Sequence, residues 1–356
     1  MTVKTDCIYF RGDIPCKPHK EEGKHCGDCN YFTKVSKKIL IIKLGAIGDV
    51  IRTTPLFSRL RNDYPDAKFF WLTHSPSVIP PAVHEVITFT AQSVVYLQSI
   101  HFDMLINLDK DKEACALATQ ISADEKYGFY LKDGVPAPVN ELAQHKFMTG
   151  LFDDLNKTNS KNYLQEIFEI CGMDYKGEKY ILDSFRQHER EWQLDHSKKV
   201  VGLNTGCGGR WVSRLWPEKN WIELAKTLYN SGYEVVLLGG QQEHDKNLKI
   251  AEQSGVKYLG YYPLETFINL VDHCDIVVTA VTMAMHITLA LNKKIVLFNN
   301  IFNRNEFELF GLGKIIEPSK ECKCFFSASC KNDEYFCMQH VEVERVYTTI
   351  EEILIS

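Results

Sequence analysis

Short apolar runs alternate with amphipathic stretches along most of this chain. Residues 39–43 form a run rich in β-branched residues that glycine soon closes, which is typical of a buried parallel strand. From Asp49 onward, apolar or small residues follow helical spacing until Tyr64 and Pro65 end the predicted helix. The runs KFFWLTH and MLINLD predict further strands, and EACALATQIS predicts a helix. This alternation indicates a doubly wound sheet, so the predicted fold class is α/β.

The second half of the chain repeats the alternation more clearly. The runs KVVGLNTG, YEVVLLGG, DIVVTA and KIVLFNN predict four strands. Between the first two, Pro217 begins a predicted helix whose apolar face includes Trp221, and Ser231 with Gly232 ends it. A further helix is predicted from about Met283 to Leu291. Both halves are therefore expected to be Rossmann-like domains.

The boundary between these domains is expected within residues 183–199, which are charged and carry little apolar sequence. In the first half, Pro136 and Pro138 break the strand pattern, and NELAQHKFMTGLFDDLNK and NYLQEIFEICG follow as predicted helices. We expect the domains to face a cleft, since ligands bind at strand carboxyl ends in such sheets. The predicted segments are a cysteine-rich head, 1–35, an N-terminal domain, 36–185, and a C-terminal domain, 186–356, which contains a cysteine-rich stretch, 322–337.

Composition narrows the class of protein. The chain has 356 residues, 45% of them hydrophobic, which is enough for two buried cores. A formal net charge of −5 argues against nucleic acid as the partner. The first 20 residues lack a secretory pattern, and no apolar stretch reaches the length of a membrane span. A cytoplasmic protein is expected, and peripheral membrane contact stays open.

Three predicted strand ends carry glycines, which let backbone N–H groups approach a phosphate. A single corner of this kind is weak evidence, because tight turns need glycine anyway. Two corners in the second half, followed by the cations Arg210 and Arg214, favour a diphosphate or nucleotide there. None fits the dinucleotide fingerprint, and no Walker lysine motif is present, which disfavours dehydrogenases and kinases. The corner glycines are Gly45 and Gly48, then Gly206, Gly208 and Gly209, then Gly239 and Gly240.

Asp49 follows the first glycine corner. One interpretation is a helix cap or first-turn acid, worth about 0.5–2 kcal/mol. The other is a general base at a strand carboxyl end, held on the domain opposite the phosphates that it would otherwise repel.

Eight of the 12 cysteines crowd into the two ends of the chain. Each cluster offers four thiolates, enough for one tetrahedral zinc or one iron, and metal binding would stabilise segments that have little core. We therefore expect structural metal sites. Free thiols, disulfides on isolation, an iron–sulfur centre and one site shared by both ends remain alternatives. The cysteines are Cys7, Cys16, Cys26 and Cys29 in the head, and Cys322, Cys324, Cys330 and Cys337 in the tail.

Four blocks of sequence resemble glycosyltransferase family 9, the ADP-heptose transferases of the lipopolysaccharide core. They are ILIIKLGAIGDVIRTTPL, GLNTGCGGRWVSRLWPEKNWIELA, VVLLGGQQEHD and TMAMHITLALNKKIVLF, in family order from residue 38 onward. Both cysteine-rich ends resemble extensions in a branch of this family. The resemblance implies a GT-B architecture, with the acceptor on the N-terminal domain and the ADP-sugar on the C-terminal one. It also implies inverting transfer without a catalytic metal, with Asp49 as the base.

Donor-binding residues follow from the glycine corners together with the resemblance. Arg214 stands where the family commonly has lysine, and His286 matches the family's histidine. The chain departs from the family at Ala280 and Val281, where Gly-Asp is usual, and in the LFNN turn, which leaves the donor sugar open. The predicted donor-binding set is Thr205, Gly206, Gly208, Arg214, Gly239, Gly240, Thr282 and His286.

The acceptor is expected to be a hydroxyl on a glycolipid or a protein. The resemblance covers enzymes of the lipopolysaccharide core and a branch that modifies serines of autotransporters, and peripheral contact with the inner membrane stays open. A catalytically weakened binding or assembly protein is the alternative that Ala280 and Val281 favour, whereas Asp49 and His286 argue against it. The order of the blocks disfavours a sugar-nucleotide epimerase.

Overall fold

The computed structural model describes residues 2–183 and 190–355. Contacts divide the chain into two compact units, with unit 1 comprising residues 1–147 and 164–178 and unit 2 comprising residues 148–163 and 179–356. The cysteine-rich head belongs to unit 1. The predicted boundary between residues 185 and 186 lies outside the described residues.

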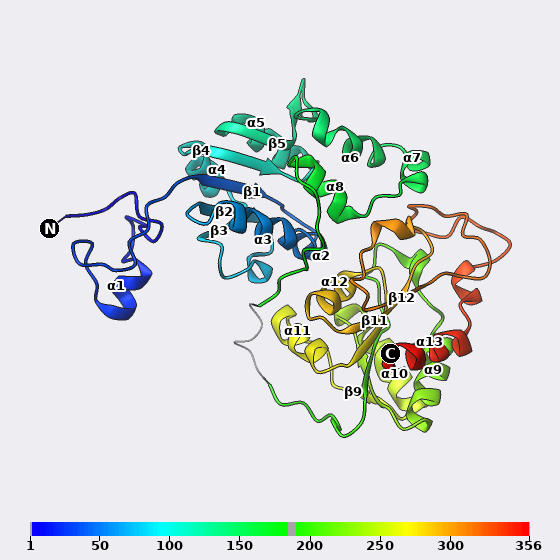
Figure 1. Ribbon diagram of the computed structural model, residues 1–356. Helices are drawn as coiled ribbons and strands as arrows, with labels where there is room; N and C mark the ends of the chain where they lie inside the picture. Colours follow the sequence, from blue (N-terminus) through cyan, green and yellow to red (C-terminus); the bar gives the residue numbers. More distant parts are fainter. Residues whose placement is uncertain (1, 184–189, 356) are drawn as a thin grey trace. The chain divides into compact units, whose positions relative to one another are not determined.

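Unit 1 is built on a six-stranded sheet in the order β3-β2-β1-β4-β5-β6 (Figure 1). All neighbouring strands pair in parallel except β5 and β6. The strand residues of β1 after Lys38 are fully buried, as expected for a strand covered on both faces. The strands are β1 (Lys38–Ile42), β2 (Lys68–Thr73), β3 (Glu85–Thr88), β4 (His101–Asn107), β5 (Ser122–Lys132) and β6 (Val135–Pro138).

The prolines that were expected to break the pattern lie in β6. This expectation was wrong because β6 is an edge strand, where proline removes no hydrogen bond from an inner ladder. Leu131 pairs with Pro136 and Phe129 pairs with Pro138 in the antiparallel hairpin. Its turn contains Asp133 and Gly134, both with positive φ, the Asp-Gly pair that two-residue hairpin turns favour.

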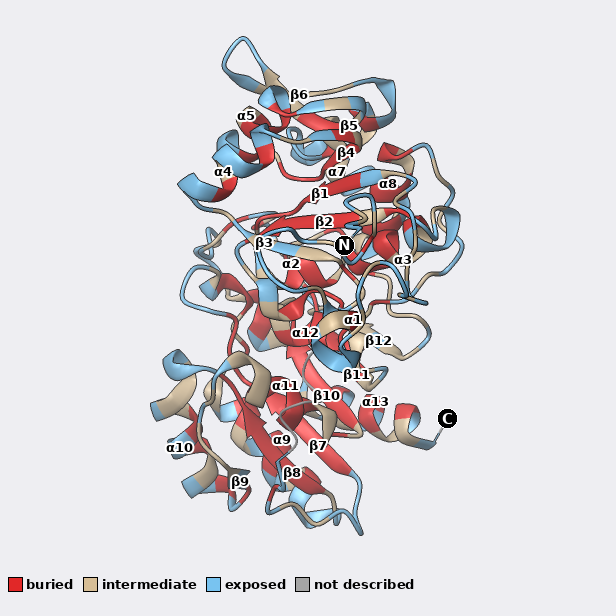
Figure 2. Cartoon of the chain, turned by 90° about the vertical axis from the view of Figure 1, so that its left-hand side faces the viewer, coloured by how far each residue is buried: buried red, intermediate tan, exposed pale blue. Residues whose placement is uncertain are grey.

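Helices of unit 1 pack on both faces of this sheet, since Phe57 of α3 contacts Phe69 and Trp71 on the face of β2 opposite the core that holds α4 and α5. One core combines apolar residues of β1 and β4 with Leu97 from α4 and Leu117 from α5. Figure 2 shows the inner strands of this sheet as buried. The helices are α1 (Lys17–Glu22), α2 (Ile47–Ile51), α3 (Thr54–Asp63), α4 (Ala91–Gln98), α5 (Lys112–Gln120), α6 (Gln144–Thr149) and α8 (Tyr163–Ile170). The last two residues of α6 and the first residue of α8 belong to unit 2.

Unit 2 contains a second six-stranded sheet, entirely parallel, in the order β12-β11-β10-β7-β8-β9. The four strands predicted in this half are present as β7, β8, β10 and β11, each with at least four buried residues. The strands are β7 (Val200–Asn204), β8 (Glu234–Leu238), β9 (Lys257–Tyr258), β10 (Ile276–Ala280), β11 (Lys294–Phe298) and β12 (Gly313–Ile316).

The helices of unit 2 bury an aromatic core. Trp216, Trp221 and Phe298 pack together with ring centroids 4.9–5.8 Å apart, and Ile350 of the last helix adds to this cluster. Pro217 caps the helix that it was predicted to begin, and Gly232 follows its end with a φ of 90°. The helices are α7 (Asp153–Thr158), α9 (Glu218–Asn230), α10 (His244–Ser254), α11 (Leu264–Asp272), α12 (Met283–Ala290) and α13 (Val343–Ile355).

One predicted helical region is interrupted. The stretch from Asn140 to Lys157 contains a 3₁₀ turn, Glu141–Ala143, then α6 and α7, with Gly150 between the two helices. Asn303 of unit 2 donates to the carbonyls of Asn156 and Asn159 at 2.6 and 2.7 Å, which ties α7 to unit 2. Among the described residues, no helix combines the length and hydropathy that crossing a bilayer requires.

Candidate functional site

The two sheets share one strand order. Numbered within each unit, both sheets follow the order 3-2-1-4-5-6. The side on which successive strands are added therefore changes between β1 and β4 in unit 1 and between β7 and β10 in unit 2. In such sheets the ligand crevice lies outside the strand carboxyl ends at this switch point. Asp49 follows β1, and the predicted donor residues follow β7, β8 and β10.

The corner after β7 is held by buried polar contacts. The Thr205 hydroxyl donates to Asn247 Oδ1 at 2.6 Å, and Lys246 Nζ donates to the Thr205 carbonyl at 2.8 Å. Burial lowers the pKa of Lys246, which is a cation that the sequence interpretation missed. Gly208 has a φ of 71°, a conformation that favours glycine. Thr205 thus serves the corner as a scaffold, while Gly208 is exposed.

Arg214 joins two strand ends of unit 2. Its guanidinium donates to the carbonyl of Val281, after β10, and Nη2 donates to the carbonyl of Cys207, after β7, at 3.2 Å. The same group lies 5.6 Å from the Trp211 ring and 5.4 Å from the Phe302 ring. Burial lowers the pKa of Arg214 to about 10, so its charge persists at neutral pH. The predicted arginine therefore lies buried at the switch point.

Thr282 directly precedes α12, the helix that follows β10, and His286 lies within it. The Thr282 side chain caps this helix by accepting from Ala284 N at 3.2 Å, and Asn204 Nδ2 reaches the same hydroxyl at 3.5 Å. His286 is buried, and its ring lies 5.9 Å from the ring of Tyr180. The structure thus brings Thr282 to the β7/β10 corner through Asn204 and packs His286 against an aromatic ring.

Glu243 lies against two of the predicted glycine corners. Gly240 N donates to Glu243 Oε2 at 3.0 Å, and a Cβ built on Gly206 would lie 2.1 Å from the Glu243 carboxyl carbon. A Cβ on Gly239 would lie 2.8 Å from the Glu243 Cβ. At Gly206 a Cβ would meet only the flexible end of the Glu243 side chain, whereas at Gly239 it would also meet the Asn247 amide at 2.9 Å. The Gly240 N–H is occupied by the Glu243 carboxylate, which a bound phosphate would have to displace.

Asp49 occupies the third position of α2. Its Oδ2 accepts from Ala46 N at 3.3 Å, and its Oδ1 pairs with Arg52 Nη2 at 2.8 Å. The carboxylate therefore has the first-turn capping contact that the simpler interpretation expects. It also remains 34% exposed, so it can reach a ligand. The capping role and the base role are compatible.

Sequence interpretation missed a buried polar cluster at the β1/β4 switch point. Lys43 and Asp109 form an ion pair, and the backbone N–H of Leu44 donates to the same carboxylate. Burial raises the pKa of Asp109, which the Lys43 charge opposes. Burial, together with the charge of Lys146, lowers the pKa of Lys110 to about 8. A lysine directly after an apolar strand was the available signal.

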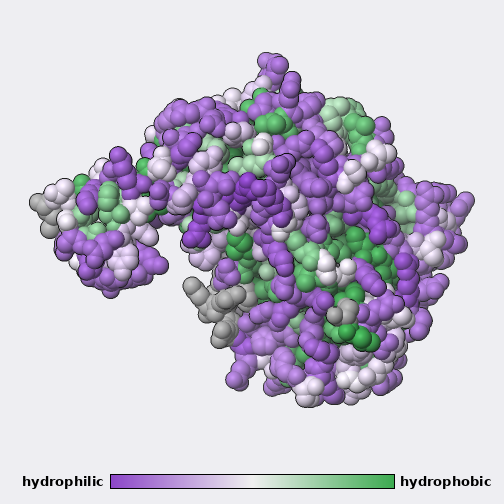
Figure 3. All heavy atoms as spheres, viewed as in Figure 1, coloured by the Kyte–Doolittle hydropathy of each residue, from purple (hydrophilic) through white to green (hydrophobic). Residues whose placement is uncertain are grey.

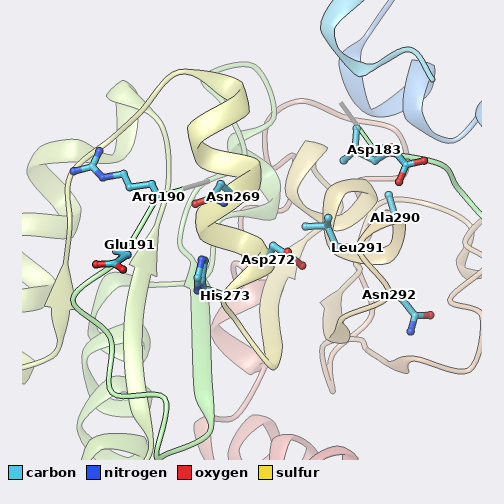
Figure 4. Close-up of a pocket in the computed structure, with 10 residues that line it drawn as sticks. Asp183, Arg190, Glu191, Asn269, Asp272, His273, Ala290, Leu291 and Asn292 are labelled. Carbon is cyan, nitrogen blue, oxygen red and sulfur yellow. The ribbon is translucent and has the colours of Figure 1, made fainter. Parts of the chain in front are cut away.

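The large cavity of unit 2 shown in Figure 4 lies elsewhere. Its volume is about 830 Å³, and it is lined at the ends of α11 and α12, which precede β10 and β11. It therefore opens at the amino ends of the strands, opposite the switch-point crevice, and we do not assign the donor to it. The lining residues are Leu182, Asp183, Arg190, Glu191, Asn269, Asp272, His273, Ala290, Leu291 and Asn292.

The four tail cysteines lie in two contacting pairs. Cys324 and Cys330 have their Sγ atoms 3.8 Å apart, and Cys322 hydrogen-bonds to Cys337. The Cys322 contact is the main cause that lowers the pKa of Cys337. Tetrahedral zinc with bonds of about 2.3 Å has a sulfur–sulfur edge of about 3.8 Å, so the spacing of the first pair fits such a site.

The four head cysteines line one small cavity of about 30 Å³. The surrounding surface is mainly hydrophilic (Figure 3). Cys16 is the N-cap residue of α1. Cys7 and Lys34 form an isolated antiparallel β-bridge, so the two ends of the head lie next to each other. Within residues 2–183 and 190–355, no three His, Cys, Asp or Glu side chains already form a group able to hold a metal ion. Metal binding by either cluster therefore stays a prediction.

Comparison with known proteins decides the family. The family model described as glycosyltransferase family 9 (heptosyltransferase) matches residues 95–302, more than half of the chain. The chain belongs to glycosyltransferase family 9. This confirms the predicted family membership, and the matched stretch includes every predicted donor residue. Asp49 and both cysteine clusters lie outside it.

Related proteins support the same grouping. A stretch of 128 residues is 30% identical to lipopolysaccharide heptosyltransferase 2 of Salmonella typhimurium, covering 34% of this chain and 35% of that enzyme. The match thus spans about a third of the relative's length.

Solved structures show the fold. The ADP-heptose lipopolysaccharide heptosyltransferase II of E. coli is 16% identical with a TM-score of 0.65, covering 89% of this chain and 98% of its own. TibC, an iron-containing dodecameric glycosyltransferase from enterotoxigenic E. coli, is 14% identical with a TM-score of 0.58, covering 90% of this chain and 79% of its own. The predicted GT-B fold class is confirmed, with two doubly wound sheets that are parallel except for the β5–β6 pair.

Proposed function

We propose that this chain is a glycosyltransferase that moves heptose, or a related sugar, from an ADP-sugar to a hydroxyl acceptor. Support comes from the family and from relatives named as lipopolysaccharide heptosyltransferases. The observation that carries the proposal is Arg214, a buried cation that joins the loop after β7 to the loop after β10 at the switch point of unit 2. That is where a Rossmann-like sheet holds a nucleotide diphosphate.

Each unit is assigned its own chemical task. In unit 2, Arg214 and the glycine corners stabilise the charge on the departing ADP, in place of a metal ion. In unit 1, Asp49 takes the proton from the acceptor hydroxyl as its oxygen bonds to the anomeric carbon and the bond to ADP breaks, inverting that carbon. The ion pair with Arg52, at 2.8 Å, holds the Asp49 carboxylate in place for this step.

The donor sugar and the acceptor are less closely defined. The Val281 carbonyl accepts from Arg214, a contact that a backbone carbonyl of any residue could make. The Val281 side chain cannot replace the aspartate carboxylate that the family usually has at this position. Heptose is proposed because the relatives carry it in their names. A glycolipid of the lipopolysaccharide core is the proposed acceptor. A protein hydroxyl is the second candidate, because the sequence also resembles the branch of the family that modifies autotransporters.

Both cysteine clusters are proposed to hold structural metal, either zinc or iron. The donor sets have the right chemistry, because each cluster contains four thiols and the Cys324–Cys330 spacing matches a tetrahedral edge, although the described side chains would have to move to surround one ion. A bound metal would cross-link segments that bury few side chains, and four sulfur ligands would leave no position for substrate.

The test of the catalytic proposal is ADP release from ADP-heptose and from a panel of other nucleotide sugars, compared between the unsubstituted chain and Asp49→Asn. Removing a general base should lower kcat by about 10²- to 10⁴-fold. The matched control is Asp63→Asn, since Asp63 also pairs with an arginine at 2.8 Å and is similarly exposed, at 39%.

Three outcomes separate the alternatives. Release by the control at the normal rate, with loss in Asp49→Asn and unchanged ADP affinity, supports the base role. Release that survives in Asp49→Asn removes Asp49 from that role. Absence of release from every donor would favour a binding or assembly protein that keeps the fold.

A further inference from the structure

The cysteine-rich segment, residues 322–337, packs directly on the loop that carries Arg214. Ser213, the residue before Arg214, is buried between the two. Its hydroxyl donates to the carbonyl of Ser327 at 2.6 Å, and its backbone N–H donates to the carbonyl of Ala328 at 3.1 Å. Because both donors of one residue bond to the same segment, the loop cannot shift without breaking these contacts.

Asn300 provides a second link, directly to the thiols. Its side-chain amide donates to the Ser213 carbonyl at 2.8 Å and lies 3.4 Å from Cys337 Sγ and 3.9 Å from Cys322 Sγ. Asn300 follows β11 in the LFNN turn that departs from the family pattern. The one amide group therefore joins a cysteine pair to the backbone of the donor loop.

Aromatic side chains extend the same contact to the guanidinium itself. Phe326 lies 5.2 Å from the ring of Phe302 and 5.8 Å from that of Trp211. These last two rings are the ones that lie next to the Arg214 guanidinium. The backbone N–H of Phe326 also donates to the Ile301 carbonyl at 2.8 Å. The segment thus supports Arg214 from its backbone neighbour and from its ring contacts.

We propose that the cysteine-rich segment positions Arg214 for the donor diphosphate, with Asn300 as the positioning residue that connects the Cys322–Cys337 pair to the Arg214 loop. The inference rests on the proposed function only in taking unit 2 as the ADP-sugar site. It gives the tail cysteines a role in donor recognition without contact with the donor. Replacing these cysteines, or removing a metal that they hold, should weaken the diphosphate contact specifically.

The test compares two ligands, ADP and adenosine, by calorimetry on the full-length chain. Asn300→Leu keeps the approximate side-chain size but removes the amide donor without adding a charge. It should weaken ADP binding about tenfold, the effect of losing one well-placed interaction, and change adenosine binding less than twofold. Asn230→Leu makes the same substitution at an exposed residue of α9 and is the control.

A second variant keeps the inference testable if Asn300→Leu unfolds. Ser213→Ala removes the hydroxyl that bonds to Ser327 and should give the same loss for ADP alone. The double variant should lose less than the sum of the two, because both act on one loop.

The outcomes distinguish this inference from the proposed function. If the unsubstituted chain binds no ADP, the proposed function fails and the inference fails with it. If that chain binds ADP but the variants bind it equally well, only the inference fails. Equal losses for ADP and adenosine would also overturn it, since they would indicate general loosening of unit 2 rather than a misplaced Arg214.

Discussion

At the scale of single residues, the geometry of Arg214 matters as much as its charge. A guanidinium can donate to the carbonyls of Cys207 and Val281 at once, whereas the ammonium of the family's usual lysine is a single point donor. In this chain the Arg214 guanidinium holds the loop after β7 and the loop after β10 together. The substitution that would restore the family residue is therefore expected to be harmful.

Arg214→Lys should weaken ADP binding at least about tenfold although the charge is kept, because one of the two carbonyl contacts and the ring contacts are lost. Calorimetry with ADP measures the change. Arg210→Lys is the matched control, since Arg210 is exposed and lies 5.2 Å from the Trp211 ring. Equal affinity of Arg214→Lys and the unsubstituted chain would show that charge alone is needed.

Lys110 is expected to destabilise unit 1 at neutral pH. Its pKa is lowered from 10.5 to about 8, first by burial and then by Lys146. Between these values the unfolded chain binds more protons, so stability rises with pH in that window, and the full penalty applies below pH 8.

Lys110→Met should accordingly raise the free energy of unfolding by about 1–3 kcal/mol at pH 7, with a smaller gain above pH 8. Urea unfolding at pH 7 and pH 9.5 provides the measurement. Lys112→Met, at an exposed position two residues away, should give no gain. A gain that does not depend on pH would mean that packing, rather than charge, is responsible.

The sequence was enough to predict site residues that follow a strand, such as Thr205, Arg214 and Asp49, because the hydrophobic pattern shows where strands end. It could not predict the buried pair of Lys43 and Asp109, because these residues are far apart in the chain and meet only when β1 pairs with β4. The roles of the predicted site residues stay predictions.

At the scale of elements, β5 approaches β4 so closely at one point that only glycine fits. Gly128 has a φ of 91°, and a Cβ there would lie 1.8 Å from the backbone oxygen of Asn107. Gly134, in the β5–β6 turn, has a similar φ of 80° but nothing within 4 Å of the built Cβ. The two glycines therefore differ in close approach and not in backbone conformation.

Gly128→Ala should destabilise unit 1 by more than about 3 kcal/mol, whereas Gly134→Ala should cost only the left-handed strain of about 1–2 kcal/mol. Hydrogen exchange of the β4 and β5 amides reports this difference within unit 1. Similar exchange rates in the two variants would contradict the close packing of β5 on β4.

Elements with strong periodicity were the predictable ones. The buried strands and α9, with its single apolar face, lie where the pattern placed them. The β5–β6 hairpin was missed because its prolines outweighed the Asp-Gly turn, although edge pairing tolerates them. The interruption between α6 and α7 was missed because α7 bonds to Asn303, far along the chain.

At the scale of the whole molecule, each unit repeats the same strand order and has predicted site residues near its own switch point. The alternation in the sequence was enough to predict two such sheets, because parallel strands with crossover helices permit few arrangements. The segment 148–163 belongs to unit 2 although it precedes the end of unit 1 in sequence. Its place depends on contacts such as that of Asn162 with Glu308, which no local pattern encodes.

The two cysteine clusters belong to different units, the head to unit 1 and the tail to unit 2. If each cluster holds its own metal, elemental analysis after reducing purification should give about two metal ions per chain, because each four-thiolate set completes one tetrahedral site. Cys26→Ser and Cys324→Ser should then each remove about one, and the double variant both.

A single site drawing on both ends predicts a different pattern. About one metal ion per chain would be found, and either substitution alone would abolish most of it, because each would remove a ligand from the same ion. Cys274→Ser is the control for thiol loss, since Cys274 belongs to neither cluster, is buried in unit 2 and hydrogen-bonds to the Leu270 carbonyl. Far less than one metal ion per chain in the unsubstituted protein would mean that both clusters are packed free thiols rather than metal sites. The position of Arg214 would then depend on the contacts of Ser213 and Asn300 alone.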